Sequence, residues 1–369
     1  MGSTLSSEDR LHLARALKLA RRGWGRVHPN PHVGCVLTKD GVVVGEGWHQ
    51  EYGGPHAEIN ALRQAGERAV GATAFLSLEP CNHHGQTPPC SEALLAAGIS
   101  RMVYASPDPG RVSGGGAEVL RRGGVDVFGP VLLPPESRRE NPAFYYNQVM
   151  EATYVALKLA QTLDGKISEG PGLRTEITGR EARREAHRLR AGFDALMVGS
   201  GTIAADDPLL TVREEVPMRK PPARIVLDSR CSLSPKARLF QDVPEIPLVV
   251  FVREDASELA IEELEDAGAK VHPVPRGPGG VSLSAVLEIC WETGIRSIFC
   301  EGGGRLAHTL MWGGQAQRLY LFVAPFVLGE KGVSAFPGGG PRAMWDQWMP
   351  TSPPEQFGRD VLLTLDRTA

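Results

Sequence analysis

The chain alternates strand-like and helix-like segments from one end to the other, and this alternation limits the folds that it can adopt. Short apolar runs rich in Val, Ile and Leu predict buried strands, and apolar residues three and four positions apart predict helices. Strands that alternate with helices form mostly parallel sheets covered by helices. We therefore expect an α/β protein with a mostly parallel sheet in each half.

The first half of the chain carries signals for one helix followed by alternating strands and helices. Ser6 or Ser7 can cap a helix that ends before Gly23, and residues 39–41, Lys-Asp-Gly, separate two apolar runs as a hairpin turn does. We expect strands at residues 33–37, 42–44, 74–78, 101–105 and 125–128, and helices at about residues 56–64, 91–97 and 117–122.

Residues 129–147 have the composition of a junction between two domains. Prolines at 130, 134, 135 and 142 stand among charged residues there, and proline interrupts both helices and strands. The length of 369 residues corresponds to about two domains of ordinary size. We therefore expect one domain at residues 1–146 and a second at residues 147–369.

The alternation restarts beyond the junction. Thr178-Gly179-Arg180-Glu181 has the pattern of a capping box that opens a helix ending near Arg190. We expect further helices at residues 257–267 and 284–291, and strands at residues 155–159, 195–198, 225–227, 248–252, 270–274, 297–300 and 319–323.

Composition excludes several classes of function. Basic and acidic residues number 40 and 43, so the net charge of −3 gives no electrostatic footprint for a nucleic-acid binder or a polybasic membrane anchor. We find neither an apolar run of the ~18 residues that a membrane helix needs nor an apolar signal core. We therefore expect a cytoplasmic protein that binds neither nucleic acid nor membrane.

Six cysteines are too few for a disulfide scaffold, and they fall into two groups. Four stand alone in apolar runs and are expected to be buried small hydrophobic residues: Cys35, Cys231, Cys290 and Cys300. The other two, Cys81 and Cys90, lie at the two ends of one loop.

One imidazole and two thiolates make a candidate metal site in the first half. His56 and Cys90 fall at expected helix starts, where the helix N-terminus favours a thiolate, and Cys81 follows an expected strand. Three protein ligands with an open fourth position are the pattern of a catalytic zinc site. Glu58, two residues after the histidine, can face the bound water without being a ligand.

These residues match the His-x-Glu and Pro-Cys signature of zinc-dependent deaminases. Zinc brings the pKa of bound water down toward ~7, and Glu58 can take a proton from that water and deliver protons to the ring nitrogen and the departing ammonia. The alternatives are a structural zinc module without catalysis and a solvated helix start beside unrelated cysteines. We interpret the set as a centre for hydrolytic deamination.

The loop between the two cysteines resembles a known family. Residues 80–90, PCNHHGQTPPC, and residues 28–36, HPNPHVGCV, are similar to the deaminase half of the bifunctional riboflavin biosynthesis family, and the resemblance extends over nearly the whole chain. It implies a cytidine-deaminase-like three-layer domain that acts on a phosphorylated pyrimidine, a diaminopyrimidine ribosylamino phosphate. It also implies substrate contacts by Asn30, His49 and His83.

Two residues of this loop depart from the family pattern. Asn82 stands where the family usually has Ser. Gln86 stands where the family usually has Lys or Arg, a base that can hold the substrate phosphate. Because the amide donates a hydrogen bond but brings no charge, the phosphate contact there is weakened.

The second half carries two glycine-rich turns at expected strand ends. Residues 301–306, EGGGRL, lie between a strand and a helix, where glycine lets the backbone approach a phosphate and the helix N-terminus supplies donors. Residues 198–202, VGSGT, form the second turn. A single glycine run is more often a plain turn than a cofactor site, so the residues alone leave both interpretations open.

The second half of the chain also resembles the same family. The similar motifs are residues 157–159, 163–167, 198–202, 205–213, 228–229 and 301–304. They resemble its reductase domain, which has a dihydrofolate-reductase-like α/β fold and uses NADPH. The implied cofactor contacts are Ala160, Thr202, Asp206, Ser229, Gly303, Gly304, Arg305, Leu306, Ala307, His308 and Thr309. The implied substrate contacts are Lys158, Arg190, Leu210, Arg213 and Glu301.

Residues 174–176, Arg-Thr-Glu, depart from the Ser-x-Trp that many members of the family carry. Glu176 cannot stack as an indole can, and its charge can repel a phosphorylated cofactor. Arg174 can compensate by binding phosphate.

We therefore expect a bifunctional enzyme that forms a homo-oligomer. Its first domain uses zinc to deaminate the pyrimidine, and its second uses NADPH to reduce the ribosyl side chain to ribityl by hydride transfer to C1′. Lys158 is the first candidate for the general acid of the reduction. The alternatives are a monofunctional deaminase with an impaired reductase domain and a nucleic-acid base deaminase, which the net charge disfavours.

Overall fold

A computed structural model describes residues 5–84, 88–340 and 342–368. Its contacts divide the chain into two compact units, the first ending at Glu151 and including Pro217–Arg219, and the second starting at Ala152. The boundary that we predict between residues 146 and 147 falls inside helix α6 (Pro142–Met150). Each unit is described by itself below.

The first unit is built on a five-stranded sheet of order β2-β1-β3-β4-β5. The strands are β1 (Gly34–Lys39), β2 (Val42–Trp48), β3 (Thr73–Leu78), β4 (Arg101–Ser106) and β5 (Asp126–Phe128). The expected hairpin turns at Asp40-Gly41, so β1 and β2 are antiparallel. β1 is also antiparallel to β3, whereas β3, β4 and β5 are parallel. The prediction of a mostly parallel sheet is therefore wrong for this unit.

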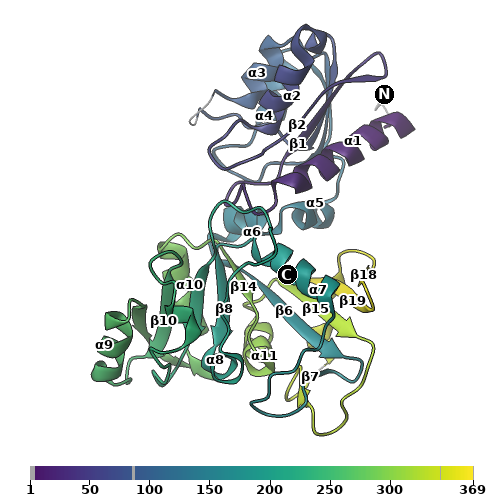
Figure 1. Cartoon of the computed structure of the whole chain (residues 1–369). Helices are drawn as coiled ribbons and strands as arrows, with labels where there is room; N and C mark the ends of the chain where they lie inside the picture. The colour runs from purple at the N-terminus through teal and green to yellow at the C-terminus, as the bar shows by residue number, and fades with distance from the viewer. Residues whose placement is uncertain (1–4, 85–87, 341, 369) are drawn as a thin grey trace. The chain divides into compact units, whose positions relative to one another are not determined.

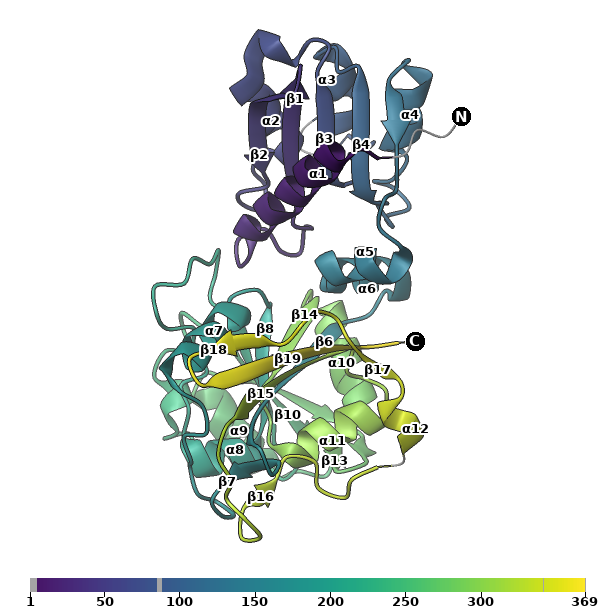
Figure 2. The ribbon, with the colours of Figure 1, turned by 90° about the vertical axis from the view of Figure 1, so that its right-hand side faces the viewer.

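Helices cover both faces of this sheet. α1 (Ser7–Ala20) packs against one face, and α2 (Ala57–Ala65), α3 (Cys90–Ala96) and α4 (Gly116–Arg122) pack against the other, as Figures 1 and 2 show. Ser6 caps α1 by accepting a hydrogen bond from the backbone N–H of Asp9. The result is the expected three-layer arrangement.

The proline-rich junction is helical rather than irregular. It contains α5 (Pro134–Glu140) and α6 (Pro142–Met150), and both helices begin with proline. Proline is favoured in the first turn of a helix because its missing N–H has no partner there in any case. The prolines therefore start these helices.

The second unit is built on a longer sheet of order β11-β10-β9-β8-β14-β6-β15-β19-β17, with β18 also paired to β19. The strands are β6 (Tyr154–Thr162), β8 (Ala195–Gly199), β9 (Ala223–Leu227), β10 (Leu248–Arg253), β11 (Lys270–Val274), β14 (Ser297–Cys300), β15 (Arg318–Ala324), β17 (Trp348–Pro350), β18 (Glu355–Phe357) and β19 (Asp360–Arg367). From β11 to β15 every pairing is parallel, as expected. The antiparallel edge formed by β17, β18 and β19 is a feature that the sequence analysis missed.

Helices flank this sheet on both faces. The helices are α7 (Arg180–Arg190), α8 (Ser200–Asp206), α9 (Glu258–Asp266), α10 (Leu283–Glu292), α11 (Gly304–Trp312) and α12 (Arg342–Trp345). α10 and α11 share one apolar core with β6, β8 and β14. Figure 2 shows α7 on the other face of the sheet from these two helices. The shorter elements are β7 (Lys166–Ser168), β12 (Arg276–Gly277), β13 (Gly280–Val281), β16 (Val333–Ser334), η1 (Arg21–Gly23), η2 (Gly66–Ala69) and η3 (Arg238–Phe240).

The capping box predicted for α7 is wrong in detail. Gly179, not Thr178, is the residue that caps the helix, and no side chain of the predicted box caps it. Instead the backbone N–H of Gly179 donates to Asp360 Oδ2 at 2.6 Å. A carboxylate from β19, distant in the chain, therefore lies at the start of α7.

The structure also shows where the cysteines outside the candidate metal site lie. Cys35, Cys231, Cys290 and Cys300 are all buried free cysteines, as expected. Within the residues that the structure describes, no helix is both long enough and apolar enough to cross a bilayer.

Gly34 lies where the backbone of α1 comes close to β1. A Cβ added there would lie 2.1 Å from the carbonyl oxygen of Ala16 and 2.7 Å from the backbone nitrogen of Ala20. Backbone atoms inside a packed helix cannot move aside as the end of a side chain can. Glycine at this position therefore fixes how closely α1 packs on β1.

Gly34→Ala is expected to lower the free energy of unfolding by about 2 kcal/mol, because α1 must shift from its contact with β1. Urea unfolding followed by circular dichroism measures the change. Gly54→Ala is the control, since the nearest atom to its added Cβ is Glu51 O at 3.1 Å, and its effect should be much smaller. Equal unfolding midpoints for the two variants would contradict this account of the packing.

Candidate functional site

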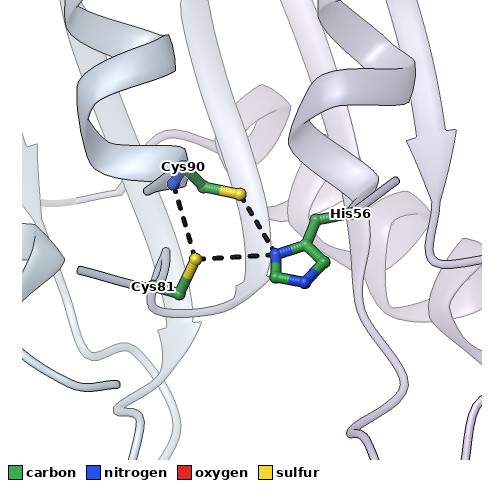
Figure 3. A group of neighbouring side chains, drawn as sticks. All are labelled: His56, Cys81 and Cys90. Carbon is green, nitrogen blue, oxygen red and sulfur yellow. Dashed lines mark hydrogen bonds between the residues drawn. The ribbon is translucent and has the colours of Figure 1, made fainter. Parts of the chain in front are cut away.

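Three side chains that the sequence separates converge in the first unit. His56 Nδ1 lies 3.3 Å from Cys90 Sγ and 3.5 Å from Cys81 Sγ, and the three donor atoms all lie within 4.8 Å of one another. Figure 3 shows the imidazole and the two sulfurs directed at one another. This convergence is the geometry that the sequence pattern predicts for a metal site.

The ends of three elements place these donors. His56 is the residue that caps α2, Cys90 is the first residue of α3, and Cys81 lies in the loop after β3. The backbone N–H of Cys90 donates to Cys81 Sγ at 3.4 Å. Hydrogen bonding by Cys90 holds the pKa of the Cys81 thiol well below its ordinary value, which favours the thiolate that a metal requires.

The donor set fits zinc. Bonds of ~2.0 Å to nitrogen and ~2.3 Å to sulfur in a tetrahedral site place neighbouring donors roughly 3.5 Å apart. The two nitrogen–sulfur separations, 3.3 and 3.5 Å, agree with that spacing. Among the described residues the cluster contains three ligands, which is the number of protein ligands in a catalytic zinc site.

Glu58 lies beside this cluster without belonging to it. Its side chain is buried, and Oε2 has no hydrogen-bond partner among the described residues. Burial raises the pKa of this carboxyl to about 6. A buried carboxyl with a free oxygen next to three metal donors is placed to exchange protons there.

Asn30 and His49 also come together in this unit. Asn30 Nδ2 lies 3.3 Å from His49 Nε2, and His49 Nδ1 lies 3.1 Å from the carbonyl oxygen of Pro55. The carbonyl can only accept, so Nδ1 carries the proton and Nε2 accepts from the asparagine. The ring of His49 lies 5.4 Å from that of His56, which places the pair close to the metal donors.

His83 lies in the loop that follows Cys81. Its Nδ1 is buried and has no hydrogen-bond partner in the described part of the chain. Such an atom usually has a partner, so a ligand is a natural one. Gln86, where the sequence analysis expects a weakened phosphate contact, lies outside the described residues.

The second unit places three charged side chains together at the end of β14. Arg190 donates from Nε and Nη2 to Glu301 Oε2 at 2.8 and 2.6 Å, and Lys158 Nζ lies 3.9 Å from Glu301 Oε1. Burial opposes ionisation of Glu301, but Arg190 and Lys158 outweigh it and hold the pKa of the carboxyl below its ordinary value. Burial lowers the pKa of Lys158.

The other expected substrate contacts lie on the segment after α8. Leu210 is buried and has a positive φ of 49°. Arg213 follows Leu210 on the same segment. Burial lowers the pKa of Arg213, and the charge of Arg190 lowers it further. The segment runs beside α7, because Arg190 Nη1 donates to the carbonyl oxygen of Thr211, two residues before Arg213.

The expected cofactor residues lie at the carboxyl ends of neighbouring parallel strands. Ala160 lies in β6, Thr202 and Asp206 lie in α8 after β8, and Ser229 follows β9. The turn at Gly279 and Gly280 lies against two expected cofactor residues. A Cβ on Gly280 would meet Ser229 Oγ, and a Cβ on Gly279 would meet Thr309 Oγ1. Ligands of parallel α/β sheets bind at this edge.

The glycine-rich turn after Glu301 starts α11, and Gly303 caps the helix. A Cβ on Gly303 would meet no atom within 4 Å, whereas one on Gly304 would lie 2.6 Å from the carbonyl oxygen of Ala335. Gly303 therefore leaves open space at the helix N-terminus, which suits a phosphate.

Not every side chain of the stretch from Gly303 to Thr309 is free for a cofactor. Ala307 is buried in the core, and Leu306 packs against that core. His308 stacks on Trp312 with ring centroids 4.0 Å apart, and Thr309 donates to the carbonyl oxygen of Arg305. The backbone N–H of Ala307 also donates within the chain, to the carbonyl oxygen of Gly303 at 3.1 Å.

The departure at residues 174–176 has a structural counterpart. Glu176 Oε2 accepts from Arg183 Nη1 at 3.0 Å, and Arg183 also donates to the carbonyl oxygen of Thr178. Arg183 therefore forms an exposed ion pair with the carboxylate that was expected to repel a phosphorylated cofactor.

The sequence analysis missed His187, which lies on α7 three residues before Arg190. It is buried, and its Nδ1 accepts from the backbone N–H of Arg213 at 3.1 Å. The spacing of His187 and Arg190, which places both on one helix face, was the signal available in the sequence.

Comparisons with known proteins match both units. Residues 6–106 match the family model of the cytidine and deoxycytidylate deaminase zinc-binding region. Residues 153–363, more than half of the chain, match the model of the RibD C-terminal domain. The two matches cover the two units in order.

Relatives of similar length match across both halves. The riboflavin biosynthesis protein RibD of Escherichia coli is 39% identical over 345 residues, which is 90% of this chain and 92% of that protein. RibD of Aquifex aeolicus is 40% identical over 323 residues, which is 87% of this chain and 88% of that protein.

Solved structures agree with these matches. The structure of Acinetobacter baumannii RibD has a TM-score of 0.82 at 32% identity and covers 98% of this chain and 99% of that one. A diaminohydroxyphosphoribosylaminopyrimidine deaminase/5-amino-6-(5-phosphoribosylamino)uracil reductase from Thermotoga maritima has a TM-score of 0.81 at 31% identity, with the same coverage.

Cys90→Ser is expected to lower bound zinc from about one ion per chain to a small fraction of that, because the site loses one of its three protein ligands. Metal analysis of desalted protein measures the content. Cys290→Ala, which removes a buried thiol of the second unit, is the control and should retain zinc. Equal zinc in both variants and the wild type would show that the metal is held elsewhere.

Proposed function

The chain belongs to the RibD family of bifunctional riboflavin biosynthesis proteins, and from this premise we propose which of its residues carry each half-reaction. The observation that carries the proposal is the convergence of His56, Cys81 and Cys90 beside the buried Glu58.

The protein is a bifunctional enzyme, a zinc-dependent deaminase followed by an NADPH-dependent reductase. Its reactions are hydrolytic deamination of 2,5-diamino-6-ribosylamino-4(3H)-pyrimidinone 5′-phosphate and reduction of the ribosyl side chain to ribityl. The relatives span both halves, so neither a monofunctional deaminase nor a nucleic-acid deaminase is favoured.

In the deaminase unit, His56, Cys81 and Cys90 hold the zinc ion. When bound, zinc activates water as a nucleophile at neutral pH. Glu58 takes up the two protons of the attacking water in turn, and passes one to the ring nitrogen and the other to the departing amine. Water thus replaces the exocyclic amine, which leaves as ammonia, and the buried carboxyl returns to its starting protonation state.

Asn30, His49 and His83 bind the pyrimidine substrate. The hydrogen bond between Asn30 and His49 supports this assignment because it fixes the tautomer of the imidazole beside the metal donors. The buried Nδ1 of His83, which has no partner among the described residues, supports a contact of this side chain with substrate.

In the reductase unit, Lys158, Arg190, Leu210, Arg213 and Glu301 contact the substrate. NADPH, when bound, supplies the hydride that C1′ accepts. Lys158 donates the accompanying proton, a role that its burial next to Glu301 supports because burial favours loss of a proton from the ammonium group. Arg190 and Arg213 bind the phosphate.

The cofactor contacts follow the edge of the sheet. Ala160, Thr202, Asp206, Ser229 and the stretch from Gly303 to Thr309 contact NADPH. The open space at Gly303, at the start of α11, supports a phosphate position there.

The enzyme acts in the cytoplasm as a homo-oligomer. Exposed apolar side chains of the second unit, among them Leu163 and Val327, support an interface between copies. Sedimentation of the purified protein tests the oligomeric state, and a monomer at micromolar concentration would contradict it.

Glu58→Gln is expected to retain zinc and to lower the rate of ammonia release by about 10²–10⁴-fold, because the amide cannot take up the proton from water. Coupled ammonia detection and metal analysis measure the two quantities. Glu67→Gln, an exposed acid of the same unit, is the control. Unchanged ammonia release in Glu58→Gln would leave the zinc site with a structural role.

Lys158→Met is expected to lower the rate of NADPH oxidation by about 10²-fold or more, with ammonia release unchanged, because the reduction loses its proton donor. The absorbance of the reduced cofactor, measured with the deaminated intermediate, reports the rate. Lys270→Met, on an exposed position of β11, is the matched control. If the wild type released ammonia but oxidised no NADPH, the reductase assignment would be wrong.

A further inference from the structure

The segment that carries Leu210 and Arg213 has an unfavourable backbone. Asp207, Leu210, Glu214 and Glu215 have φ values of 38°, 49°, 68° and 22°. Residues with a Cβ rarely adopt this left-handed region. A segment with four such residues keeps one shape only where neighbouring groups hold it.

Hydrogen bonds from other elements hold this segment along its length. The backbone N–H of Arg238 donates to Asp207 Oδ1 at 2.9 Å. Arg190 Nη1 on α7 donates to the carbonyl oxygen of Thr211 at 2.8 Å. His187, one turn earlier on α7, accepts from the backbone N–H of Arg213 at 3.1 Å. His187 therefore holds the very residue whose guanidinium is assigned to the substrate phosphate.

The imidazole of His187 is suited to this single task. An N–H can only donate, so Nδ1 must be unprotonated and the ring must be neutral. The ring is buried, and Arg190 Nη1 lies 3.5 Å from the same nitrogen. Burial and the nearby guanidinium groups of Arg190 and Arg213 lower the pKa of His187 to about 4, so the ring stays an acceptor at neutral pH.

We propose that His187 is a positioning residue of the reductase: its Nδ1 anchors the backbone of Arg213 and so sets this guanidinium beside Arg190 for the substrate phosphate. The proposal rests on the substrate role proposed for Arg213. His187 touches neither the reacting carbon nor the hydride donor in this assignment. Its loss should therefore weaken substrate binding rather than slow the chemical step.

A pair of amide variants tests the position of the acceptor. Asn places its Oδ1 close to the position of the histidine Nδ1, whereas Gln places its amide about one atom further from the helix. We expect His187→Gln to raise the KM for the deaminated, phosphorylated intermediate about tenfold, with little change in kcat, and His187→Asn to stay within about threefold of the wild type. Arg184→Gln, an exposed residue of the same helix, is the control.

A combined variant separates positioning from general damage. Arg213→Met removes the guanidinium that His187 is proposed to position. In that background, His187→Gln should add less than about a twofold rise in KM, because the two changes act through one contact. The KM for NADPH and the rate of ammonia release should stay at their wild-type values in every variant.

The outcomes distinguish this proposal from the assignment beneath it. If Arg213→Met leaves the KM unchanged, the substrate role of Arg213 is wrong. If Arg213→Met raises the KM but His187→Gln and His187→Asn behave alike, the positioning role is overturned. If the rises in KM of His187→Gln and Arg213→Met multiply in the combined variant, the positioning role is overturned as well. The two changes would then act independently, as they would if His187→Gln only damaged the structure.

Discussion

Both centres of this protein form where the end of a strand meets the start of a helix. In the first unit, Cys81 follows β3 and Cys90 begins α3. In the second, Glu301 follows β14 and leads into the cap of α11. Free backbone N–H groups and the positive end of the helix dipole gather at such places. In the first unit the N–H of Cys90 at the helix start favours a thiolate at Cys81, and in the second the open helix start leaves room for a phosphate.

Two buried glutamates, Glu58 and Glu301, have pKa values shifted in opposite directions by the groups around them. Burial raises the pKa of Glu58 to about 6, and Oε2 is left without a hydrogen-bond partner in the described chain. Glu301 is also buried, yet Arg190 and Lys158 hold its pKa below the ordinary value. The first suits proton exchange, and the second suits a fixed charge that orders the two cations beside it.

The order of the secondary elements was predictable because their signals are local. The strand runs of the second half, the hairpin at Asp40-Gly41 and the cap at Ser6 all follow from residues close together in the chain. The direction of the pairing in the first unit, the antiparallel edge at β19 and the start of α7 at Gly179 do not. Each depends on a partner distant in sequence, such as Asp360 for Gly179.

The sequence by itself determined the chemistry that the chain can hold: one imidazole, two cysteines and an acid in the order of a zinc deaminase, with six more residues between the cysteines than the generic spacing, and a glycine-rich turn after a buried strand. Only the tertiary structure decided that Nδ1 of His56 faces both sulfurs, that Arg183 pairs with Glu176, and that His187 holds the backbone of Arg213. Residue types follow from the chain alone, but distances and protonation depend on burial and on neighbours that folding brings together.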